Sequence, residues 1–321
     1  MKTDRFSILV AEKSSFSLQG LQALAEIGPV SARDLSQSEL VEAVNGYSIL
    51  IIRLGLQVTA EVMRANPKLL AIGTPTTGLD HLDLETAHHL GIEILSLKGE
   101  RAFLDQVYAT AEHTMALMLA LLRHVPAAFN AVKRYEWRRD IYRGYELNGK
   151  TLGIVGCGRL GGMVARYGMA FGMRVLAYDP YQPMLPEGVL GYDGLAEMLG
   201  ECDIVSIHVP LNEETRGMFS EDQFNRLRSG AWLVNTARGA VIDANALIRA
   251  LESGRLAGAA LDVLPAEGEL KPGKSNALIE YARAHDNLLI TPHIGGATQE
   301  SVEKADLFLA RKLDQFLKTR N

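Results

Sequence analysis

Residues 151 to 179 contain the feature that most constrains the fold, a glycine-rich turn between two strand-like segments. Leu152 to Val155 is a short apolar run, and three glycines follow it at once in the spacing Gly-x-Gly-x-x-Gly. Met163 to Phe171 continues at helical spacing, and Arg174 to Tyr178 is a second apolar run. The order strand, turn, helix and strand predicts a parallel-sheet unit that binds the pyrophosphate of a dinucleotide at the helix N-terminus.

Each glycine of this turn has a separate role in such a unit. Gly156 makes the tight turn, Gly158 lets the backbone approach the pyrophosphate, and Gly161 lets the helix pack closely on the sheet. Arg159 and Leu160 lie within the same turn, and we expect them to contact the cofactor as well. The alternative is a plain strand-to-helix turn without a ligand, because the glycine spacing alone is a weak signal.

An acidic residue ends the second strand of this unit. Asp179 lies about as far beyond the glycines as the dinucleotide fingerprint requires, and its carboxylate can accept hydrogen bonds from the adenosine ribose diol. A 2'-phosphate would be repelled by the same carboxylate. The sequence therefore favours the dinucleotide interpretation over a plain turn, and NAD over NADP.

The remainder of the chain also alternates strands with helices, which predicts an α/β fold with two doubly wound parallel-sheet domains. In the first hundred residues, strands are expected at Ser7 to Ala11, Ile49 to Ile52 and Leu69 to Ile72, and helices at Leu18 to Ile27, Ser38 to Val44 and Thr59 to Ala65. After the glycine turn, the alternation continues from Asp203 to Ile290. A length of 321 residues suffices for two such domains.

The last segment, Thr298 to Lys318, is an amphipathic helix that the preceding domain does not need. We expect it to return to the N-terminal domain. The predicted substrate domain is therefore discontinuous, residues 1–99 with 295–321, and the predicted Rossmann domain for NAD spans residues 100–294.

Arg101 to Arg123 is predicted to form one long helix. Its second half, Met115 to Leu122, is apolar nearly all round, so it must be buried on more than one side. We expect a homodimer to bury the second side; the alternative is a helix buried between the two domains. Pro126 is expected to break this pattern, and Ala127 to Trp137 begins a second segment whose arginine-rich end favours a solvated or dimer-contacting face over a nucleic-acid patch.

Charge, cysteine content and hydropathy exclude several classes of partner. A formal net charge of -5 argues against a basic nucleic-acid surface. Two cysteines form no disulfide framework, and Phe6 to Val10 is too short for a signal-peptide core, so a reducing cytoplasm is the expected location. The longest apolar run, Met115 to Leu122, is too short to span a bilayer. No spacing of His, Cys and carboxylates predicts a metal site.

Three strand ends carry residues suited to a nicotinamide enzyme, which needs a cation for the substrate and a poised proton carrier. Arg238, in Asn-Thr-Ala-Arg-Gly, can grip a carboxylate with two parallel bonds, although a surface arginine before a turn is the alternative. His293 lies between a proline and a glycine pair, and Glu267 follows the strand that ends near Asp262. Glu267 beside His293 would stabilise the imidazolium form, but a lone histidine and a lone glutamate are more often structural.

A glycine- and threonine-rich loop in the first domain is a candidate for substrate contact. Residues 73–78 read Gly-Thr-Pro-Thr-Thr-Gly and follow a predicted strand, and ligands bind beyond the carboxyl ends of parallel strands. The candidate residues are Thr76, Thr77 and Gly78. A plain turn, with its glycine and threonine needed for the backbone, is an equal alternative.

The ordered motifs GxGxxG, Asp, NTARG, ALDV with a downstream Glu, and TPHIGG resemble the D-isomer-specific 2-hydroxyacid dehydrogenases. The resemblance covers the chain from about Leu69 to Thr298, and residues 207–217 resemble the second signature block of the family. It implies a flavodoxin-like substrate domain, a Rossmann domain, NAD as cofactor, and a dimer formed through the long helix after Gly99. The implied contacts to the cofactor beyond the glycine turn are His208, Val209, Pro210, Thr215, Thr236, Ala237, Arg238, Asp262, His293 and Gly295.

The same resemblance implies the catalytic roles. His293 would be the acid/base, Glu267 its partner, Arg238 the carboxylate-binding arginine, and Asp262 the group that holds the nicotinamide carboxamide. In the oxidation of a D-2-hydroxy acid, His293 would take the hydroxyl proton as C2 gives its hydride to NAD. Glu267 favours a hydroxyacid enzyme over the related formate dehydrogenases, where no such proton moves.

The resemblance leaves the substrate open. Arg53 lies where phosphoglycerate dehydrogenases carry an arginine for the substrate phosphate, so a phosphoglycerate dehydrogenase-like enzyme is the leading expectation. Thr74, however, lies where some of those enzymes have a second cation. Glyoxylate, hydroxypyruvate and other 2-keto acids are alternatives. A different class is also open, since relatives that serve as NAD-sensing transcriptional corepressors keep the Arg, Glu and His.

Overall fold

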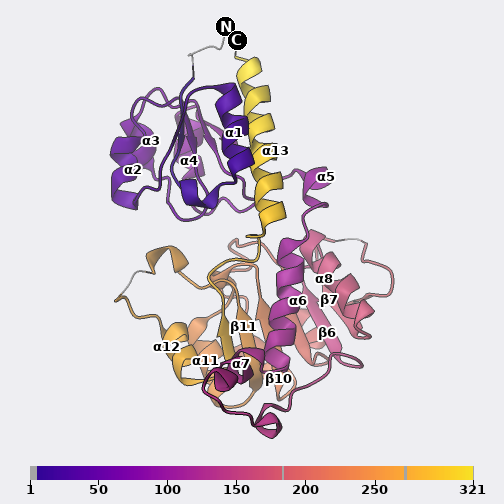
Figure 1. Ribbon diagram of the computed structural model, residues 1–321. Coiled ribbons are helices and arrows are strands. Elements are labelled where there is room, and N and C mark those ends of the chain that lie inside the picture. Colours follow the sequence, from indigo (N-terminus) through magenta and orange to yellow (C-terminus); the bar gives the residue numbers. More distant parts are fainter. Residues whose placement is uncertain (1–5, 183, 271–272, 321) are drawn as a thin grey trace. The chain divides into compact units, whose positions relative to one another are not determined.

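The computed structural model describes residues 6–182, 184–270 and 273–320. The chain divides into two compact units (Figure 1). Unit 1 combines Met1–Val107 with Ala297–Asn321, and unit 2 is Tyr108–Gly296. Each unit contains its own parallel sheet covered by helices on both faces, so the predicted α/β class with two doubly wound domains is confirmed.

Unit 1 contains a five-stranded parallel sheet in the order β2-β1-β3-β4-β5. This is the flavodoxin-like strand order. The strands are β1 (Ile8–Val10), β2 (Val30–Ala32), β3 (Ile49–Ile51), β4 (Ala71–Gly73) and β5 (Glu93–Leu95). Strands β1, β3 and β4 are buried along their whole length, because helices cover both faces of a parallel sheet.

Successive residues of each strand in unit 1 serve two separate cores. Leu9 and Leu50 point to the face covered by α2 (Gln37–Ala43), α3 (Ala60–Ala65) and α4 (Leu84–His89). Ile8 and Ile49 point to the face covered by α1 (Leu18–Ile27) and α13 (Gln299–Lys318). The alternation follows from the two-residue period of a strand.

Helix α13 lies alongside α1 in unit 1 (Figure 1). Thr298 caps its N-terminus, since its side chain accepts a hydrogen bond from the Ser301 backbone N–H. The two helices approach closely at Gly20, where a Cβ would lie only 2.4 Å from the Cβ of Asp306. The C-terminal helix therefore packs with the N-terminal residues.

Unit 2 contains a seven-stranded parallel sheet in the order β12-β11-β10-β9-β6-β7-β8. The chain reverses direction across the sheet at β6 and β9, which is the switch point of a Rossmann fold. The strands are β6 (Thr151–Val155), β7 (Arg174–Tyr178), β8 (Leu190–Gly191), β9 (Ile204–Ile207), β10 (Ala231–Asn235), β11 (Leu256–Leu261) and β12 (Leu288–Ile290).

Helices cover the two faces of this sheet and form two cores. One face carries α6 (Ala109–Leu122) and α8 (Arg159–Ala170). The other face carries α9 (Leu195–Leu199), α10 (Glu221–Arg226), α11 (Ala244–Glu252) and α12 (Ala277–Ala284). Helix α7 (Val125–Lys133) follows α6, and short 3-10 turns lie at η1 (Lys13–Ser15), η2 (Arg139–Tyr142), η3 (Gly239–Val241) and η4 (Glu267–Glu269).

The predicted single helix from Arg101 to Arg123 is wrong. It is interrupted after α5 (Arg101–Leu104), and α6 begins only at Ala109. Phe103 of α5 stacks on Phe308 of α13, and Leu104 packs in the same small cluster. These contacts place residues 100–107 in unit 1, so the units divide at 107/108 and 296/297 instead of the expected 99/100 and 294/295.

The break expected at Pro126 is present, since α6 ends at Leu122 and α7 begins at Val125, with a bend of 64° between them. Pro126 itself lies in the first turn of α7, so the second helix begins slightly before the expected Ala127. A proline is compatible with this place because the first N–H groups of a helix have no partner within the helix.

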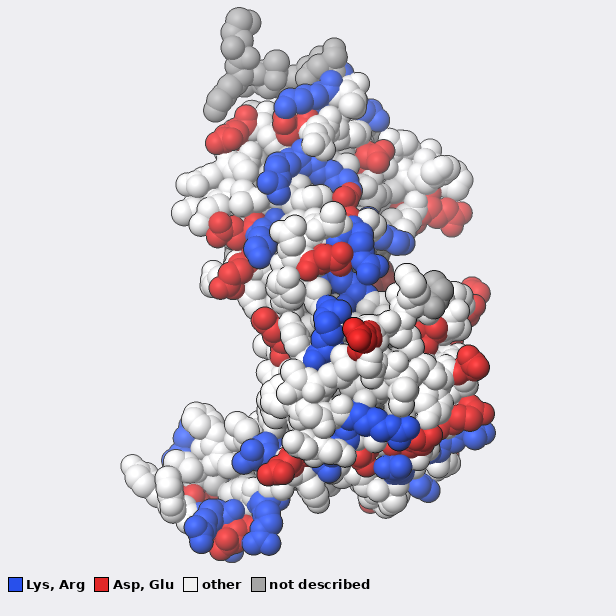
Figure 2. Space-filling view, turned by 90° about the vertical axis from the view of Figure 1, so that its right-hand side faces the viewer, with Lys and Arg blue, Asp and Glu red and all other residues white. Residues whose placement is uncertain are grey.

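The surface described by the structure gives two further observations. On the face shown in Figure 2, lysine and arginine are interspersed with aspartate and glutamate. Among the described helices, none is by itself long and apolar enough to cross a membrane; α6 and α7 reach that length and composition only as a pair bent by 64°.

Candidate cofactor and catalytic site

The glycine turn after β6 has the geometry of a dinucleotide-binding turn. Gly156 has a φ of +88°, and a Cβ there would lie 2.9 Å from the His208 carbonyl carbon. A Cβ on Gly161 would lie 2.0 Å from the Gly156 carbonyl oxygen, so helix α8 can contact the strand only without one. At Gly158, by contrast, no atom of the described residues other than its own chain neighbours lies within 4 Å of the Cβ position. The turn therefore leaves space at the one glycine where a pyrophosphate would approach.

The N-terminus of α8 lies directly beyond this space. Gly158 is its N-cap, and the Gly162 N–H donates the first helical hydrogen bond to the Gly158 carbonyl. The first N–H groups of a helix lack acceptors in the preceding turn and carry its positive dipole end, and Arg159 and Leu160 lie in this first turn. Leu160 is partly buried against the core of unit 2. The residues at this turn fit a bound dinucleotide.

Asp179 lies at the same edge of the sheet, directly after β7. Val155 and Tyr178 are register partners, and the Gly156 N–H donates to the Tyr178 carbonyl. The Asp179 side chain is partly buried, and its Oδ1 accepts the Tyr181 N–H at 3.0 Å. Its carboxylate is thus held beside the glycine turn, where it fits the role expected for the ribose.

His208 directly follows β9, and its side chain is half-buried. Burial lowers the pKa of its imidazole to about 4. Its Nε2 lies 2.8 Å from the Oγ of the buried Ser206. A neutral imidazole can therefore lie beside the cofactor turn without adding charge.

The loop that follows His208 is held by its own side chains. Thr215 Oγ1 donates to the Pro210 carbonyl at 2.6 Å and accepts the Asn212 N–H at 2.9 Å. Val209 packs at Gly156, since its Cγ1 would lie 2.9 Å from a Cβ there. The Thr215 hydroxyl thus shapes the loop, and its partner Asn212 was not among the residues expected from the sequence.

The segment after β10 presents Arg238. The buried Asn235 accepts the Ala237 N–H at 2.9 Å and donates to the Arg238 carbonyl at 3.0 Å, which defines the turn. The hydroxyl of Thr236 lies 2.8 Å from that of Thr114 in α6. A Cβ at Gly239 would lie 2.0 Å from the Leu264 carbonyl carbon, so this segment runs against the one after β11.

His293 and Glu267 form a hydrogen-bonded pair. The Nδ1 of His293 is in short contact with Oε1 of Glu267, whose Oε2 accepts the Leu264 N–H at 3.1 Å. Burial acts to raise the pKa of Glu267, but the hydrogen bond and charge of His293, with a contribution from Arg238, hold it below its ordinary value. The structure brings together the three residues predicted to be catalytic.

Asp262 holds the backbone of the His293 loop. Its carbonyl accepts the His293 N–H at 2.8 Å, its Oδ1 accepts the Ile294 N–H at 2.9 Å, and its Oδ2 accepts the Gly295 N–H at 2.7 Å. The side chain is 1% exposed. This internal role was not predicted; the resemblance assigned Asp262 only to the nicotinamide carboxamide. Sequence reasoning also missed two neighbours of this carboxylate, His113 and Thr291.

Arg53 has a partner in unit 1 that no local sequence pattern indicates. Its Nη2 donates to the buried carboxylate of Asp306 in α13, and its guanidinium lies 4.8 Å from the centre of the Phe16 ring. Glu12 accepts the Arg53 backbone N–H. The Nη2 group of Arg53 therefore has a structural function within unit 1.

The glycine- and threonine-rich loop follows β4 in the same unit. Thr76 Oγ1 donates to the Gly78 carbonyl at 2.8 Å and lies 2.9 Å from Thr74 Oγ1. Thr74 is fully buried, whereas Thr77 is exposed. Thr76 thus stabilises the loop, and Thr77 is the more accessible of the two.

Comparison with known proteins identifies the family. The model of the NAD binding domain of D-isomer specific 2-hydroxyacid dehydrogenases matches residues 115–295. The chain belongs to the D-isomer specific 2-hydroxyacid dehydrogenase family. The matched range nearly coincides with unit 2, so unit 2 is the NAD-binding domain of this family.

Members of the family align with this chain over most of its length. A D-3-phosphoglycerate dehydrogenase from Methanocaldococcus jannaschii is 36% identical over 302 residues, covering 93% of this chain and 55% of that protein. A hydroxypyruvate reductase from Thermotoga maritima is 35% identical over 284 residues, covering 88% of this chain and 89% of that protein. The chain spans about half the length of the phosphoglycerate dehydrogenases that it matches.

A solved structure of the family has the same fold. D-lactate dehydrogenase from Aquifex aeolicus, complexed with NAD and lactic acid, superposes with a TM-score of 0.81 at 30% sequence identity, covering 98% of this chain and 96% of that chain. This similarity supports the assignment of NAD as the cofactor of this chain. Within the described residues there is no group of three or more His, Cys, Asp or Glu that could hold a metal ion.

Proposed function

We propose that the protein is an NAD-dependent oxidoreductase that interconverts a D-2-hydroxy acid and the corresponding 2-keto acid. The observation that carries this proposal is the His293–Glu267 pair beside Arg238, in the same unit as the glycine turn. A histidine with one ring nitrogen bonded to a carboxylate has its other nitrogen, Nε2, available for a substrate proton. Membership in the 2-hydroxyacid dehydrogenase family supports the same reaction.

The residues suggest how the reaction would proceed. NADH, when bound, supplies the hydride that adds to C2 of the keto acid. Arg238 holds the substrate carboxylate through two parallel hydrogen bonds. His293 gives the proton on Nε2 to the carbonyl oxygen, while its Nδ1–H stays on Glu267, whose negative charge stabilises the imidazolium before transfer. In the oxidation direction, Nε2 takes the hydroxyl proton instead.

For the substrate, we propose a 3-phosphoglycerate dehydrogenase-like reaction as the leading candidate. Relatives with that name are 36% and 34% identical to this chain. The family resemblance assigns Arg53 to a substrate phosphate, although its bond to Asp306 occupies part of the guanidinium. Hydroxypyruvate or glyoxylate reduction is the second candidate, because the hydroxypyruvate reductase from Thermotoga maritima matches over most of its own length.

A panel assay separates these candidates. NADH oxidation is measured with 3-phosphohydroxypyruvate, hydroxypyruvate, glyoxylate, pyruvate and 2-ketoglutarate. A kcat/KM at least about 100-fold higher for the phosphorylated acid would support the leading candidate, and the reverse preference would support the second. Weak turnover of all five with tight NADH binding would contradict both and favour the NAD-sensing, corepressor-like alternative.

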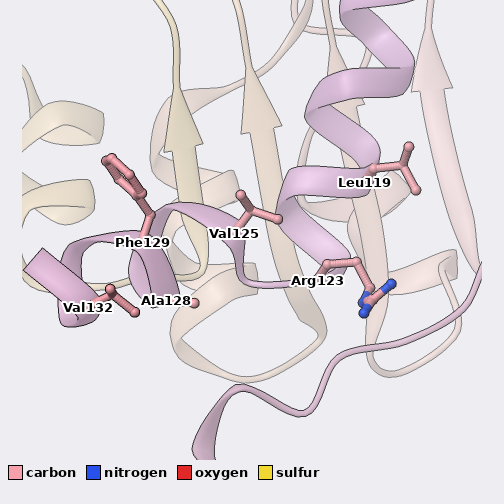
Figure 3. Close-up of a pocket in the computed structure, with 6 residues that line it drawn as sticks. All are labelled: Leu119, Arg123, Val125, Ala128, Phe129 and Val132. Atoms are coloured by element: carbon pink, nitrogen blue, oxygen red, sulfur yellow. The ribbon is translucent and has the colours of Figure 1, made fainter. Parts of the chain in front are cut away.

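We also propose that the protein assembles as a homodimer through α6 and α7. A groove of about 630 Å³ is lined by Leu119 of α6, by Arg123 at the C-cap of that helix, and by Val125, Phe129 and Val132 of α7 (Figure 3). Phe129 is 63% exposed and Val125 is 52% exposed, so an apolar surface continues from the partly buried α6. A second copy of the chain would cover it. Phe129→Glu is expected to shift the mass measured by light scattering from dimer to monomer; an unchanged mass would contradict this interface.

A further inference from the structure

Helix α6 contacts both segments that carry the candidate catalytic residues. Thr114 bonds to Thr236, two residues before Arg238. In the same helical turn, the Nε2 of His113 lies 3.1 Å from the Oγ1 of Thr291 and 3.2 Å from the Oδ1 of Asp262. Thr114 is fully buried, and the His113 side chain is 19% exposed. One helical turn thus connects the Arg238 segment to the His293 loop.

The hydrogen bonds determine which nitrogen of His113 carries a proton. The Thr291 hydroxyl donates its only hydrogen to Oδ1 of Asp262, at 2.6 Å. A carboxylate of Asp262 accepts hydrogen bonds and donates none. Both oxygens near Nε2 of His113 are therefore acceptors, so Nε2 must carry a hydrogen, which it donates to Thr291 Oγ1, with Asp262 Oδ1 3.2 Å away.

His113 is connected to the backbone of His293 through the side chain of Asp262. Oδ1 of Asp262, which His113 contacts, also accepts the Ile294 N–H, while the Asp262 carbonyl accepts the His293 N–H. His293 has a φ of 54°, a left-handed conformation that costs a non-glycine residue roughly 1 kcal/mol or more. The bonds from Asp262 offset that cost, and His113 helps to hold the carboxylate that supplies them.

We propose that His113 is a positioning residue for His293, acting through Asp262 and Thr291. This role depends on the hydrogen-bond donor at Nε2 and does not require a positive charge on the ring. This inference rests on the proposed dehydrogenase reaction. Loss of the donor would leave the acceptors of Asp262 and Thr291 without that partner, and the His293 loop would move relative to Arg238. Because the transfer of proton and hydride depends on alignment, kcat should fall more than cofactor binding.

Two substitutions separate the donor from the rest of the side chain. Glutamine can place its amide nitrogen near the position of Nε2, so His113→Gln keeps a donor, whereas His113→Leu removes it. We expect His113→Leu to lower kcat about 30-fold, with the Kd for NADH within twofold of wild type, and His113→Gln to stay within about threefold in kcat. Glu112→Gln is the matched control, because Glu112 is exposed on the same helical turn.

A second measurement does not depend on turnover. In protein labelled with 15N-histidine, the ring nitrogen shifts and their couplings to ring protons report the tautomer of His293. Wild type is expected to show the Nδ1–H tautomer, bonded to Glu267, and His113→Leu a mixture with the Nε2–H tautomer. The proposal is overturned if His113→Leu keeps the wild-type kcat and tautomer, or if His113→Gln loses as much as His113→Leu.

The two assays distinguish failure of this inference from failure of the proposed function. A wild-type protein that turns over no 2-keto acid would refute the dehydrogenase proposal, while the tautomer comparison would still test whether His113 positions His293. A parallel fall in the affinity for NADH and in the melting temperature of His113→Leu would show a general structural role and overturn the specific one.

Discussion

His293 combines a chemical role with an unusual backbone conformation. Its φ of 54° places it in the left-handed region, where asparagine is tolerated better than most residues. Asparagine at this position should therefore keep the backbone but cannot carry a proton between substrate and solvent. We expect His293→Asn to lower kcat by at least about 1,000-fold with NADH affinity within about threefold. Steady-state kinetics and fluorescence titration check this; a kcat near wild type would contradict the acid/base assignment.

His208 should make the protein less stable in mild acid. The pKa of its imidazole in the folded protein, about 4, lies below the ordinary value of 6.5, so the unfolded chain binds more protons between these values. Stability due to this residue is therefore complete above pH 6.5 and decreases as pH falls toward 4.

A pH comparison tests this prediction. Between about pH 7.5 and 5.5, wild type should lose on the order of 1 kcal/mol more unfolding free energy than His208→Gln, which has no titrating ring. Urea unfolding at both pH values gives the four free energies required. Equal losses in the two proteins would contradict an imidazole of His208 that the fold keeps neutral.

Within the element formed by β6, the turn and α8, two glycines serve different purposes. Gly158→Ala introduces a Cβ that meets no atom of the described residues beyond its own chain neighbours, although its ψ of −149° lies outside the regions that alanine usually adopts. Gly161→Ala introduces one that would lie 2.0 Å from the Gly156 carbonyl oxygen. The first glycine leaves room for a ligand and the second allows helix packing.

The corresponding pair of variants should separate binding from stability. Gly158→Ala should weaken NADH binding at least about tenfold, with a smaller loss of unfolding free energy than Gly161→Ala. Gly161→Ala should lower the unfolding free energy by roughly 2 kcal/mol or more, because backbone must move to accept the methyl group. Calorimetry of both variants with and without NADH checks the pair, and unchanged NADH affinity in Gly158→Ala would contradict the dinucleotide turn.

The break between α5 and α6 has its cause in tertiary contacts of unit 1. Phe103 and Leu104 pack with residues of α13, such as Phe308, and the chain turns at 105–108 before α6 begins. Helical spacing continues across this break in the sequence, so periodicity alone could not reveal it. The aromatic stacking and apolar contact energy favour the interrupted form over a few more helical hydrogen bonds.

At the scale of the whole chain, Arg53 and Asp306 connect the two ends that make up unit 1. They are 253 residues apart in sequence. Burial lowers the pKa of Arg53 and raises the pKa of Asp306, in each case against the attraction of the partner. Arg53 Nε is buried without a hydrogen-bond partner among the described residues. Desolvation therefore opposes this pair strongly, and removal of either charge leaves the other uncompensated.

The burial of these two charges predicts a pattern of stabilities. Arg53→Met should lower the unfolding free energy of the protein by about 3 kcal/mol, and Asp306→Leu added to it should recover part of that loss, since neither charge of the pair is then buried without its partner, while Ser17 loses its acceptor. Urea unfolding of the wild type, both single variants and the double variant gives the four unfolding free energies of this double-mutant cycle. If Arg53 served only to bind a substrate phosphate, the Arg53→Met variant would have the same midpoint of urea unfolding as the wild type.

The sequence by itself determined the fold class and the NAD-binding turn, because both depend on local rules, whereas the roles of the candidate catalytic residues came from the resemblance of short motifs to a known family. The turn is indicated by the spacing of three glycines, Gly156, Gly158 and Gly161. Short motifs at strand ends contain Arg238 and His293. Only the tertiary structure decided that Asp306 pairs with Arg53 and that His113 contacts Asp262. Those partners are far apart along the chain, and their selection depends on which surfaces meet when helices pack on sheets, which no local pattern encodes.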